Sequence, residues 1–194
     1  MENYLRATDV IDWQQPDVLK LAHGLSSGTP LSTAKRCYEW VRDEIRHSND
    51  YQMNPVTCSA SEVLQAGTGF CYAKSHLLAA LLRANGIPAG LCYQRLRVDE
   101  HGERCCLHGL NAVYTPELGW YRVDPRGNNA TVNAQFVPSV EQLAFKLSDG
   151  ETDVPGIWAD PLPEVLAALR ACHTYIEVMQ NLPDVDPQTI PLRA

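Results

Sequence analysis

The spacing of hydrophobic residues predicts helices through the first half of the chain. Residues 16–25 (PDVLKLAHGL) can bury one side of a short amphipathic helix. A longer helix is predicted within residues 31–48, where Ser32 or Thr33 can serve as the N-cap. Its apolar residues recur at helical intervals, at positions 34, 37, 38, 41 and 45.

Two more helices are predicted before Pro88. The sequence Ser59-x-x-Glu62 matches a capping box and indicates a short helix that ends at Gly67. The next apolar segment predicts a helix over residues 70–85, since Gly86 and the proline beyond it are helix stop signals. The first half of the chain is therefore expected to be mainly helical.

The pattern becomes strand-like after Pro88. Strands are predicted over residues 89–99, 105–115 and 119–125, with a turn at 100–104 and the connection TPELG between the last two. Farther on, the predicted elements are a loop at 125–138, a helix at 139–147, a turn at 148–156 and a helix at 162–180.

This order of elements predicts an α+β fold, in which N-terminal helices pack on an antiparallel β-sheet and further helices follow. The length of 194 residues fits one domain spanning the whole chain. We expect residues 31–126 to form its core and residues 138–182 to form a C-terminal helical extension.

Charge and hydropathy narrow the choice of partners. A net charge of -7 argues against nucleic acid or an anionic membrane, because phosphate binding draws on clustered lysine and arginine. The N-terminus lacks a basic start followed by an apolar core, and no apolar run reaches the ~18 residues needed to cross a bilayer. We expect a soluble, cytoplasmic protein with a small or neutral substrate, and the oligomeric state stays open.

The chain contains seven cysteines, at positions 37, 58, 71, 92, 105, 106 and 172. An odd number without an export signal argues against a disulfide framework. Most of these thiols are therefore expected to be reduced and to behave as small buried hydrophobic groups.

Cys71 differs from the other cysteines in its expected position. The break Thr68-Gly69-Phe70 places it in the first turn of the helix predicted over 70–85. There the unpaired backbone N–H groups and the positive end of the helix dipole stabilise a thiolate. The same N–H groups can hold the oxyanion of a tetrahedral intermediate, and Gly69 would let a substrate approach closely.

A thiolate nucleophile generally needs an imidazole nearby. His76 follows the thiol by five residues, about 140° around the helix, so it should face away. His108 is the better candidate. If TPE is a three-residue loop, Tyr114 opposes Leu118 and His108 opposes Asp124 across two antiparallel strands. The carboxylate could then orient the imidazole, giving a nucleophile, base and orienter set.

Four residues near these motifs allow more than one interpretation. Gln52 and Asn54 could be side-chain oxyanion donors, or they could be exposed loop amides without a role. Trp120 could form a wall of the site, but the hydrophobic core is favoured. Lys74, one turn after the thiol, could support the thiolate, but we expect a solvated surface lysine.

The segment HGERCCLH contains four possible metal ligands, His101, Cys105, Cys106 and His108. Zinc is disfavoured, because in a strand Cys105 points away from the other two and no Cys-x-x-Cys pair is present. SDGETD also lacks a calcium-loop pattern. No metal or cofactor is therefore expected.

These segments resemble the transglutaminase-like superfamily, the papain-related cysteine enzymes of the transglutaminase core. The resemblance rests on ASEVLQAGTGFCYAKSHLLAALLRANGIPAG and HGLNAVYTPELGWYRVDP, with the helix before them at 31–47. By position it implies Cys71 as nucleophile, His108 as base and Asp124 as orienter. The sequence departs from the family at Leu110, where many members carry an aromatic residue.

Resemblance and residues together imply an acyl-transfer enzyme. We expect Cys71 to attack the carbonyl of a peptide or small amide, with hydrolysis favoured over transamidation to an amine acceptor. The flanking β-domains of the animal cross-linking enzymes are missing from the sequence, so calcium-dependent cross-linking does not follow. A binding protein that retains the fold without catalysis is the alternative.

Overall fold

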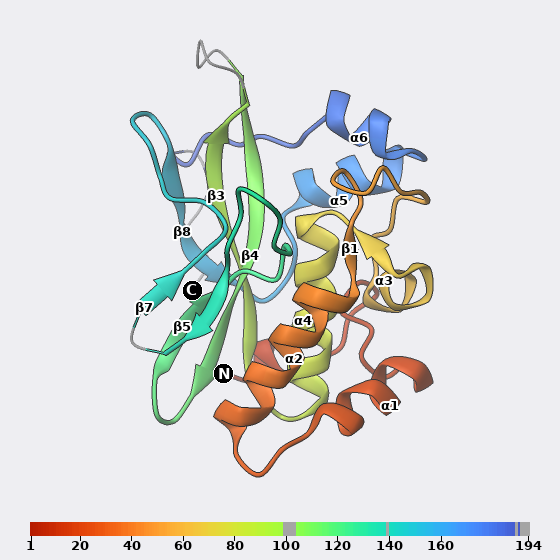
Figure 1. Cartoon of the computed structure of the whole chain (residues 1–194), viewed down its shortest axis with the longest axis vertical. Helices are drawn as coiled ribbons and strands as arrows, with labels where there is room; N and C mark the ends of the chain where they lie inside the picture. Colours follow the sequence, from red (N-terminus) through yellow and green to blue (C-terminus); the bar gives the residue numbers. More distant parts are fainter. Residues whose placement is uncertain (99–103, 139, 189, 191–194) are drawn as a thin grey trace.

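The computed structural model of the protein describes residues 1–98, 104–138, 140–188 and 190 (Figure 1). Its helices are η1 (Glu2–Tyr4), α1 (Pro16–Leu25), α2 (Pro30–Glu44), α3 (Ala60–Ala66), α4 (Cys71–Ala84), α5 (Pro163–Ala171) and α6 (Tyr175–Gln180). Within these described parts, no helix is long and apolar enough to cross a bilayer.

The main sheet has four antiparallel strands in the order β5-β4-β3-β8. They are β3 (Ala89–Arg97), β4 (Cys105–Thr115), β5 (Gly119–Val123) and β8 (Thr152–Trp158). Two small pairs stand outside it: β1 (Arg46–His47) runs parallel to β2 (Thr68–Gly69), and β6 (Gln135–Val137) is antiparallel to β7 (Val140–Gln142).

Helix α4 is the centre of the fold. Every residue from Cys71 to Arg83 is buried, because the helix packs against β3 and β4 on one side and against α1, α2 and α3 on the other. Figure 1 shows these helices gathered on one face of the sheet. The predicted α+β arrangement of N-terminal helices on an antiparallel sheet is confirmed, and it fixes the start of α4 against β4.

The start and end of α2 differ from the prediction. Its N-cap is Thr29, whose hydroxyl accepts a hydrogen bond from the Ser32 backbone N–H, and Pro30 occupies the first helical position, where its fixed φ suits a helix. Ser32 instead completes the capping box. The helix ends at Glu44 because the next residues pair with Thr68–Gly69 as β1 and β2.

The structure contradicts most of the predicted elements between 125 and 158. The loop predicted at 125–138 contains β6, and the helix predicted at 139–147 contains β7. These strands pair with each other, and the Tyr121 hydroxyl donates to the Val140 carbonyl at 2.8 Å, so tertiary contacts override the local pattern. The turn predicted at 148–156 contains most of β8, an edge strand, where Pro155 is tolerated.

The long helix predicted at 162–180 is two helices. Helix α5 ends at Ala171, and Thr174 starts α6 through a capping box with Glu177. The predicted helical extension at 138–182 is therefore a mixture of strands and helices. This region matters for the site, because residues from 144–151 and from α6 lie near the start of α4.

Candidate active site

Cys71 is the first residue of α4, as the sequence predicted, and Phe70 is the N-cap. The thiol is 7% exposed. It faces β4, where the backbone N–H of Gly109 donates a hydrogen bond to Sγ at 3.5 Å. The helix N-terminus and this N–H both favour negative charge on the sulfur.

His108 and Asp124 lie side by side, although the predicted register was wrong. In the β4–β5 ladder Tyr114 lies opposite Trp120, so the three-residue loop is Pro116–Leu118. The error is two residues, and a shift of two leaves each side chain on its own face of the sheet. Asp124 therefore still reaches the imidazole, with His108 Nε2 at 2.7 Å from Asp124 Oδ2.

The carboxylate of Asp124 is completely buried and held from three sides. Besides the imidazole, it accepts hydrogen bonds from the backbone N–H of Arg126 at 3.1 Å and of Ala144 at 3.0 Å. Phe145 packs edge-on against the His108 ring, with centroids 4.8 Å apart. With Nε2 bound to the carboxylate, Nδ1 of His108 remains for the thiol.

Charge in the site favours a thiolate and an imidazolium. Burial alone would raise the pKa of Cys71, but the charge of His108 and hydrogen bonds from His108 and His47 outweigh it and lower the pKa to about 6. Burial alone would lower the pKa of His108, but the charges of Asp124 and Cys71 raise it to about 10. The pKa of Asp124 is lowered, because His108 outweighs burial.

A second imidazole, His47, lies beside the thiol. It belongs to β1 and pairs with Gly69, close in sequence to Cys71, and it lines the same cleft. It is 7% exposed, and its Nδ1 lies 3.3 Å from Asp50 Oδ1. Sequence reasoning missed His47, because a two-residue parallel pairing leaves no periodic signal.

Arg126 connects the two carboxylates of the site. Its guanidinium binds both oxygens of Asp50 at 2.8 Å, while its backbone N–H binds Asp124. Hydrogen bonding from His47 is the main reason that the pKa of Asp50 is lowered, and Arg126 adds to it. Two imidazole–carboxylate pairs therefore act on the thiol, and Arg126 binds the carboxylate of each.

Gly109 allows β4 to approach the start of α4. A Cβ at this position would lie 2.9 Å from Tyr72 Cδ1 and 3.1 Å from Tyr72 Cα. The Tyr72 hydroxyl also donates to the Leu107 carbonyl. These contacts hold the strand that carries His108 directly against the helix that carries the thiol.

Gln52 and Asn54 do not reach the thiol. Both are exposed and neither lines its cleft. Gln52 occupies a turn with a positive φ of 52°. Asn54 Oδ1 accepts a hydrogen bond from the Tyr175 backbone N–H at 2.8 Å, so it fixes the start of α6. Of the two interpretations that the sequence allowed, the structure therefore favours exposed loop amides over oxyanion donors.

Gly69 does not have the predicted role, whereas Trp120 packs in a hydrophobic cluster, the interpretation that the sequence favoured. A Cβ on Gly69 would lie 3.2 Å from Ala73 Cβ and from Thr57 Oγ1, so this glycine permits close packing of the chain rather than approach of a substrate. Trp120 packs edge-on against Tyr4 and belongs to a separate small cluster. Leu110, the departure from the family pattern, lies in that same cluster.

Lys74 is completely buried, which contradicts the expected surface position. Its Nζ donates to the carbonyls of Arg42 and Ile45, and it therefore satisfies backbone groups at the end of α2. Burial lowers the pKa of Lys74 to about 7.

The other cysteines have no environment of this kind. All seven are free thiols, and burial raises the pKa of Cys37, Cys92 and Cys106 to about 12. No group of three metal-ligating side chains occurs among the described residues. The possible ligand His101 lies outside them.

A cleft of about 380 Å³ opens onto the thiol. Its walls come from the start of α4, the ends of β3 and β4, residues 145–151 and α6 with the segment after it. Cys71, His108 and His47 line it together with apolar side chains such as Leu96, Phe145 and Met179. A substrate carbonyl in this cleft would lie next to the sulfur.

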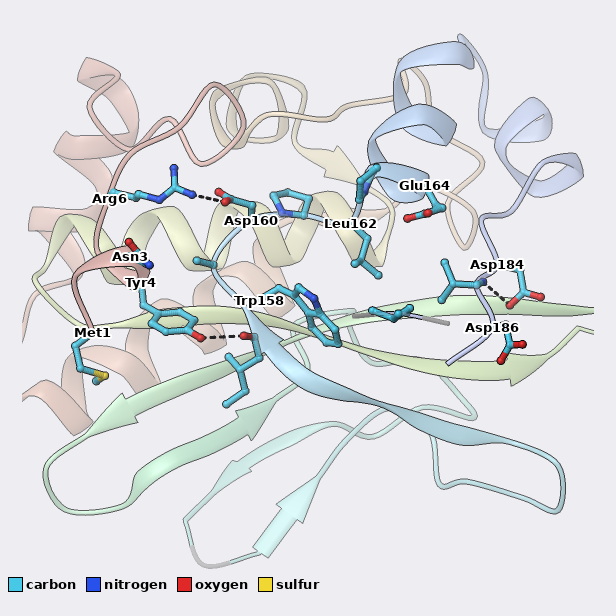
Figure 2. Close-up of a pocket in the computed structure, with 16 residues that line it drawn as sticks. Met1, Asn3, Tyr4, Arg6, Trp158, Asp160, Leu162, Glu164, Asp184 and Asp186 are labelled. Carbon is cyan, nitrogen blue, oxygen red and sulfur yellow. Dashed lines mark hydrogen bonds and ion pairs between the residues drawn. The ribbon is translucent and has the colours of Figure 1, made fainter. Parts of the chain in front are cut away.

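A larger cavity of about 570 Å³ lies elsewhere (Figure 2). The N-terminal segment, the end of β8 with the start of α5, residues 184–186 and Ile190 line it, and Arg6 pairs there with Asp160. It exposes further carboxylates, from Glu164, Asp184 and Asp186. Since no member of the thiol site lines it, the candidate active site is the smaller cleft.

Comparison with known proteins identifies one matching family. The family model described as the transglutaminase-like superfamily matches residues 20–125. None of the curated proteins matches the chain by sequence. This match covers more than half of the chain and confirms the predicted resemblance.

Three of these solved structures illustrate the similarity. One is a putative cysteine protease from Cytophaga hutchinsonii, 18% identical with a TM-score of 0.49 over 63% of this chain and 40% of that one. The periplasmic domain of TgpA from Pseudomonas aeruginosa is 23% identical, with a TM-score of 0.47 over 63% and 45%. A TGase is 16% identical, with a TM-score of 0.42 over 79% and 41%. This chain spans less than half of their lengths.

Proposed function

This chain belongs to the transglutaminase-like superfamily, and we propose that it is a cysteine enzyme that cleaves an amide or peptide bond through a thioester. The superfamily commonly has cysteine-based acyl transfer or protease activity. The observation that carries the proposal is the buried set of Cys71, His108 and Asp124, of which Cys71 and His108 line a cleft of about 380 Å³. We propose these three as the catalytic residues.

In the first half of the reaction the thiolate of Cys71 attacks the carbonyl carbon. The new C–S bond pushes the carbonyl electron pair onto oxygen. The C–N bond then breaks as His108 gives its Nδ1 proton to the leaving nitrogen. The products of this half are a free amine, a thioester and a neutral imidazole, which Asp124 keeps in the correct orientation.

In the second half water replaces the amine. His108 takes a proton from the water as its oxygen bonds to the acyl carbon. Collapse of this intermediate breaks the C–S bond and restores the thiolate and imidazolium. A carboxylic acid leaves and loses its proton to solvent. A primary amine in place of water would give transamidation by the same steps.

We propose two donors for the oxyanion of each intermediate. The backbone N–H of Cys71 lies at the helix N-terminus, and the His47 imidazole, paired with Asp50, lines the same cleft as the thiol. Such preorganised donors typically contribute about 3–4 kcal/mol each to transition-state stabilisation. We therefore propose His47, in place of Gln52 or Asn54, as the side-chain donor.

A peptide library tests the proposal. The protein is incubated with the library in ¹⁸O-labelled water, with and without a biotinylated primary amine, and the products are identified by mass spectrometry. Hydrolysis gives cleaved peptides that carry ¹⁸O, whereas transamidation gives biotinylated peptides. We expect hydrolysis, and we expect Cys71→Ala to abolish it.

The alternatives give different results in the same experiment. A binding protein would retain peptides without altering them, and equal products from the wild type and Cys71→Ala would contradict the proposal. The peptide or small-amide substrate is part of this proposal. The expected cytoplasmic location and the absence of nucleic-acid and membrane partners remain predictions.

A further inference from the structure

The charged residues that line the thiol cleft are mostly positive, although the protein as a whole is negatively charged. The chain carries a net charge of -7, yet the cations that line the cleft are Arg97, Arg126 and Lys146, whereas Glu151 is the one carboxylate among the lining residues that the structure describes. The cleft is therefore locally positive on an acidic protein.

Two of these charged groups already have partners. The guanidinium of Arg126 is bound to Asp50. Glu151 accepts hydrogen bonds from the backbone N–H groups of Arg97 at 2.9 Å and Ser148 at 2.8 Å, so each of its two oxygens already has a backbone donor. Among the described residues, the guanidinium of Arg97 and the ammonium of Lys146 are the two charged groups of the cleft that have no partner.

Cations without a partner are rare in this protein. Most described lysine and arginine side chains make ion pairs, bind backbone carbonyls or stack on a ring, as Arg122, Arg83 and Arg46 do. In the described part of the chain, the exceptions are Lys20, Arg97 and Lys146. Two of these three line the thiol cleft.

The two free cations approach the cleft from separate elements. Arg97 is the last residue of β3, and its guanidinium lies over Gly150, where an added Cβ would be 2.5 Å from an arginine nitrogen. Lys146 follows Phe145, whose ring contacts His108. One positive group thus comes from the end of β3 and the other from the segment that carries Phe145, and both line the cleft.

We infer that the site selects acyl donors that carry a carboxylate beside the scissile amide. This inference rests on the proposed function and names its substrate class. The carboxylate would be paired by Arg97 and Lys146, while Leu96 and Met179 contact the apolar part of the substrate. Unpaired cations along a cleft attract anions and raise their local concentration.

Two alkylating reagents test the inference without a known substrate. Iodoacetate and iodoacetamide have the same shape and differ in charge, so the ratio of their rates at Cys71 measures the field at the thiol. We expect Arg97→Gln and Lys146→Gln each to lower the rate with iodoacetate roughly two- to tenfold at low salt, and to leave iodoacetamide unchanged. High salt should shrink the difference.

Lys20→Gln is the matched control, because it removes an unpaired, exposed cation from α1, away from the cleft. An unchanged ratio in both cleft variants, with a reactive Cys71, would overturn the carboxylate inference alone. A Cys71 that reacts no faster than Cys172 with either reagent would overturn the proposed function itself. The two failures are therefore distinguishable.

Paired peptides then identify where the carboxylate comes from. Each library peptide is compared with its C-terminal amide and with its Glu→Gln and Asp→Asn counterparts. A preference for a free C-terminus indicates a terminal carboxylate, and a preference for acidic residues indicates a side chain. Equal cleavage of all members would contradict the inference.

Discussion

His108 Nε2 lies 2.7 Å from Asp124 Oδ2, and the two side chains are 4% and 0% exposed. A buried carboxylate at this distance fixes which imidazole nitrogen faces the thiol and stabilises the charged imidazolium. The proposed chemistry depends on this pair as much as on the nucleophile.

Removing the carboxylate should therefore affect turnover strongly. We expect Asp124→Ala to reduce amide cleavage by a factor on the order of 10²–10⁴. Asp124→Asn should lose less, since its carbonyl oxygen can still accept a hydrogen bond from the Nε2–H group. Turnover of a cleaved library peptide measures both, and thermal unfolding checks that each variant is folded. Equal activity of Asp124→Ala and the wild type would exclude an orienting role.

The ionisation of Cys71 should have an unusual pH dependence. Its pKa is lowered to about 6, so the thiolate is present above that pH and is lost as the pH falls through 6. The pKa of His108 is raised to about 10, so the imidazolium persists up to that pH. Ultraviolet thiolate absorbance of the wild type minus Cys71→Ser should rise with a midpoint near pH 6.

The same titration in His108→Ala provides the control. Without the imidazolium, burial dominates, and the midpoint should move above the ordinary thiol value of 9.0. A wild-type midpoint near 9 would show that the thiol has no charged partner.

His47 should matter for acyl transfer more than for thiol reactivity. Alkylation forms no oxyanion, so we expect His47→Ala to slow amide cleavage by about 10²–10³-fold and alkylation by less than about tenfold. His47→Gln retains a side-chain N–H and should recover part of the cleavage rate. His23→Ala, on the exposed side of α1, is the control. Parallel losses in both reactions would assign His47 to thiolate stabilisation alone.

Gly109→Ala should damage both stability and reactivity. The new methyl group would lie 2.9 Å from Tyr72 Cδ1 and would push β4 away from the start of α4. We expect a loss of about 1–3 kcal/mol in the free energy of unfolding, together with slower alkylation of Cys71. Urea denaturation measures the first effect.

Gly24→Ala is the comparison for this change. Gly24 lies in α1 with nothing within 4 Å of an added Cβ, so alanine should be neutral or stabilising by about 0.5–1 kcal/mol. If both glycine variants behaved alike, the close approach of β4 and α4 would not depend on Gly109.

The sequence predicted the elements that local signals define. The start of α4 at Cys71 follows from a glycine break before a long apolar run, and the long strands follow from their period. The contact of His108 with Asp124 was predicted correctly from a wrong register, because the error was an even number of residues and left both side chains on the same face.

Other features depend on tertiary contacts that leave no local trace. Lysine is usually a surface residue, but Lys74 is buried and its Nζ donates to carbonyls at the end of α2. Residues 140–142 lie in a segment predicted to be helical but pair as strand β7, and the residues that follow bring Ala144 to Asp124 and Phe145 to His108. His47 reaches the thiol through a pairing of two residues, which is too short for any periodic pattern.

Competitive alkylation of all seven cysteines at pH 6 tests the central claim most directly. Iodoacetamide is added in limiting amount to the folded protein, and peptide mapping gives the rate at each thiol. We predict that Cys71 reacts on the order of 100-fold faster than the others, and that His108→Ala removes this advantage. A Cys71 that reacts no faster than the other thiols, or whose rate His108→Ala leaves unchanged, would contradict the account.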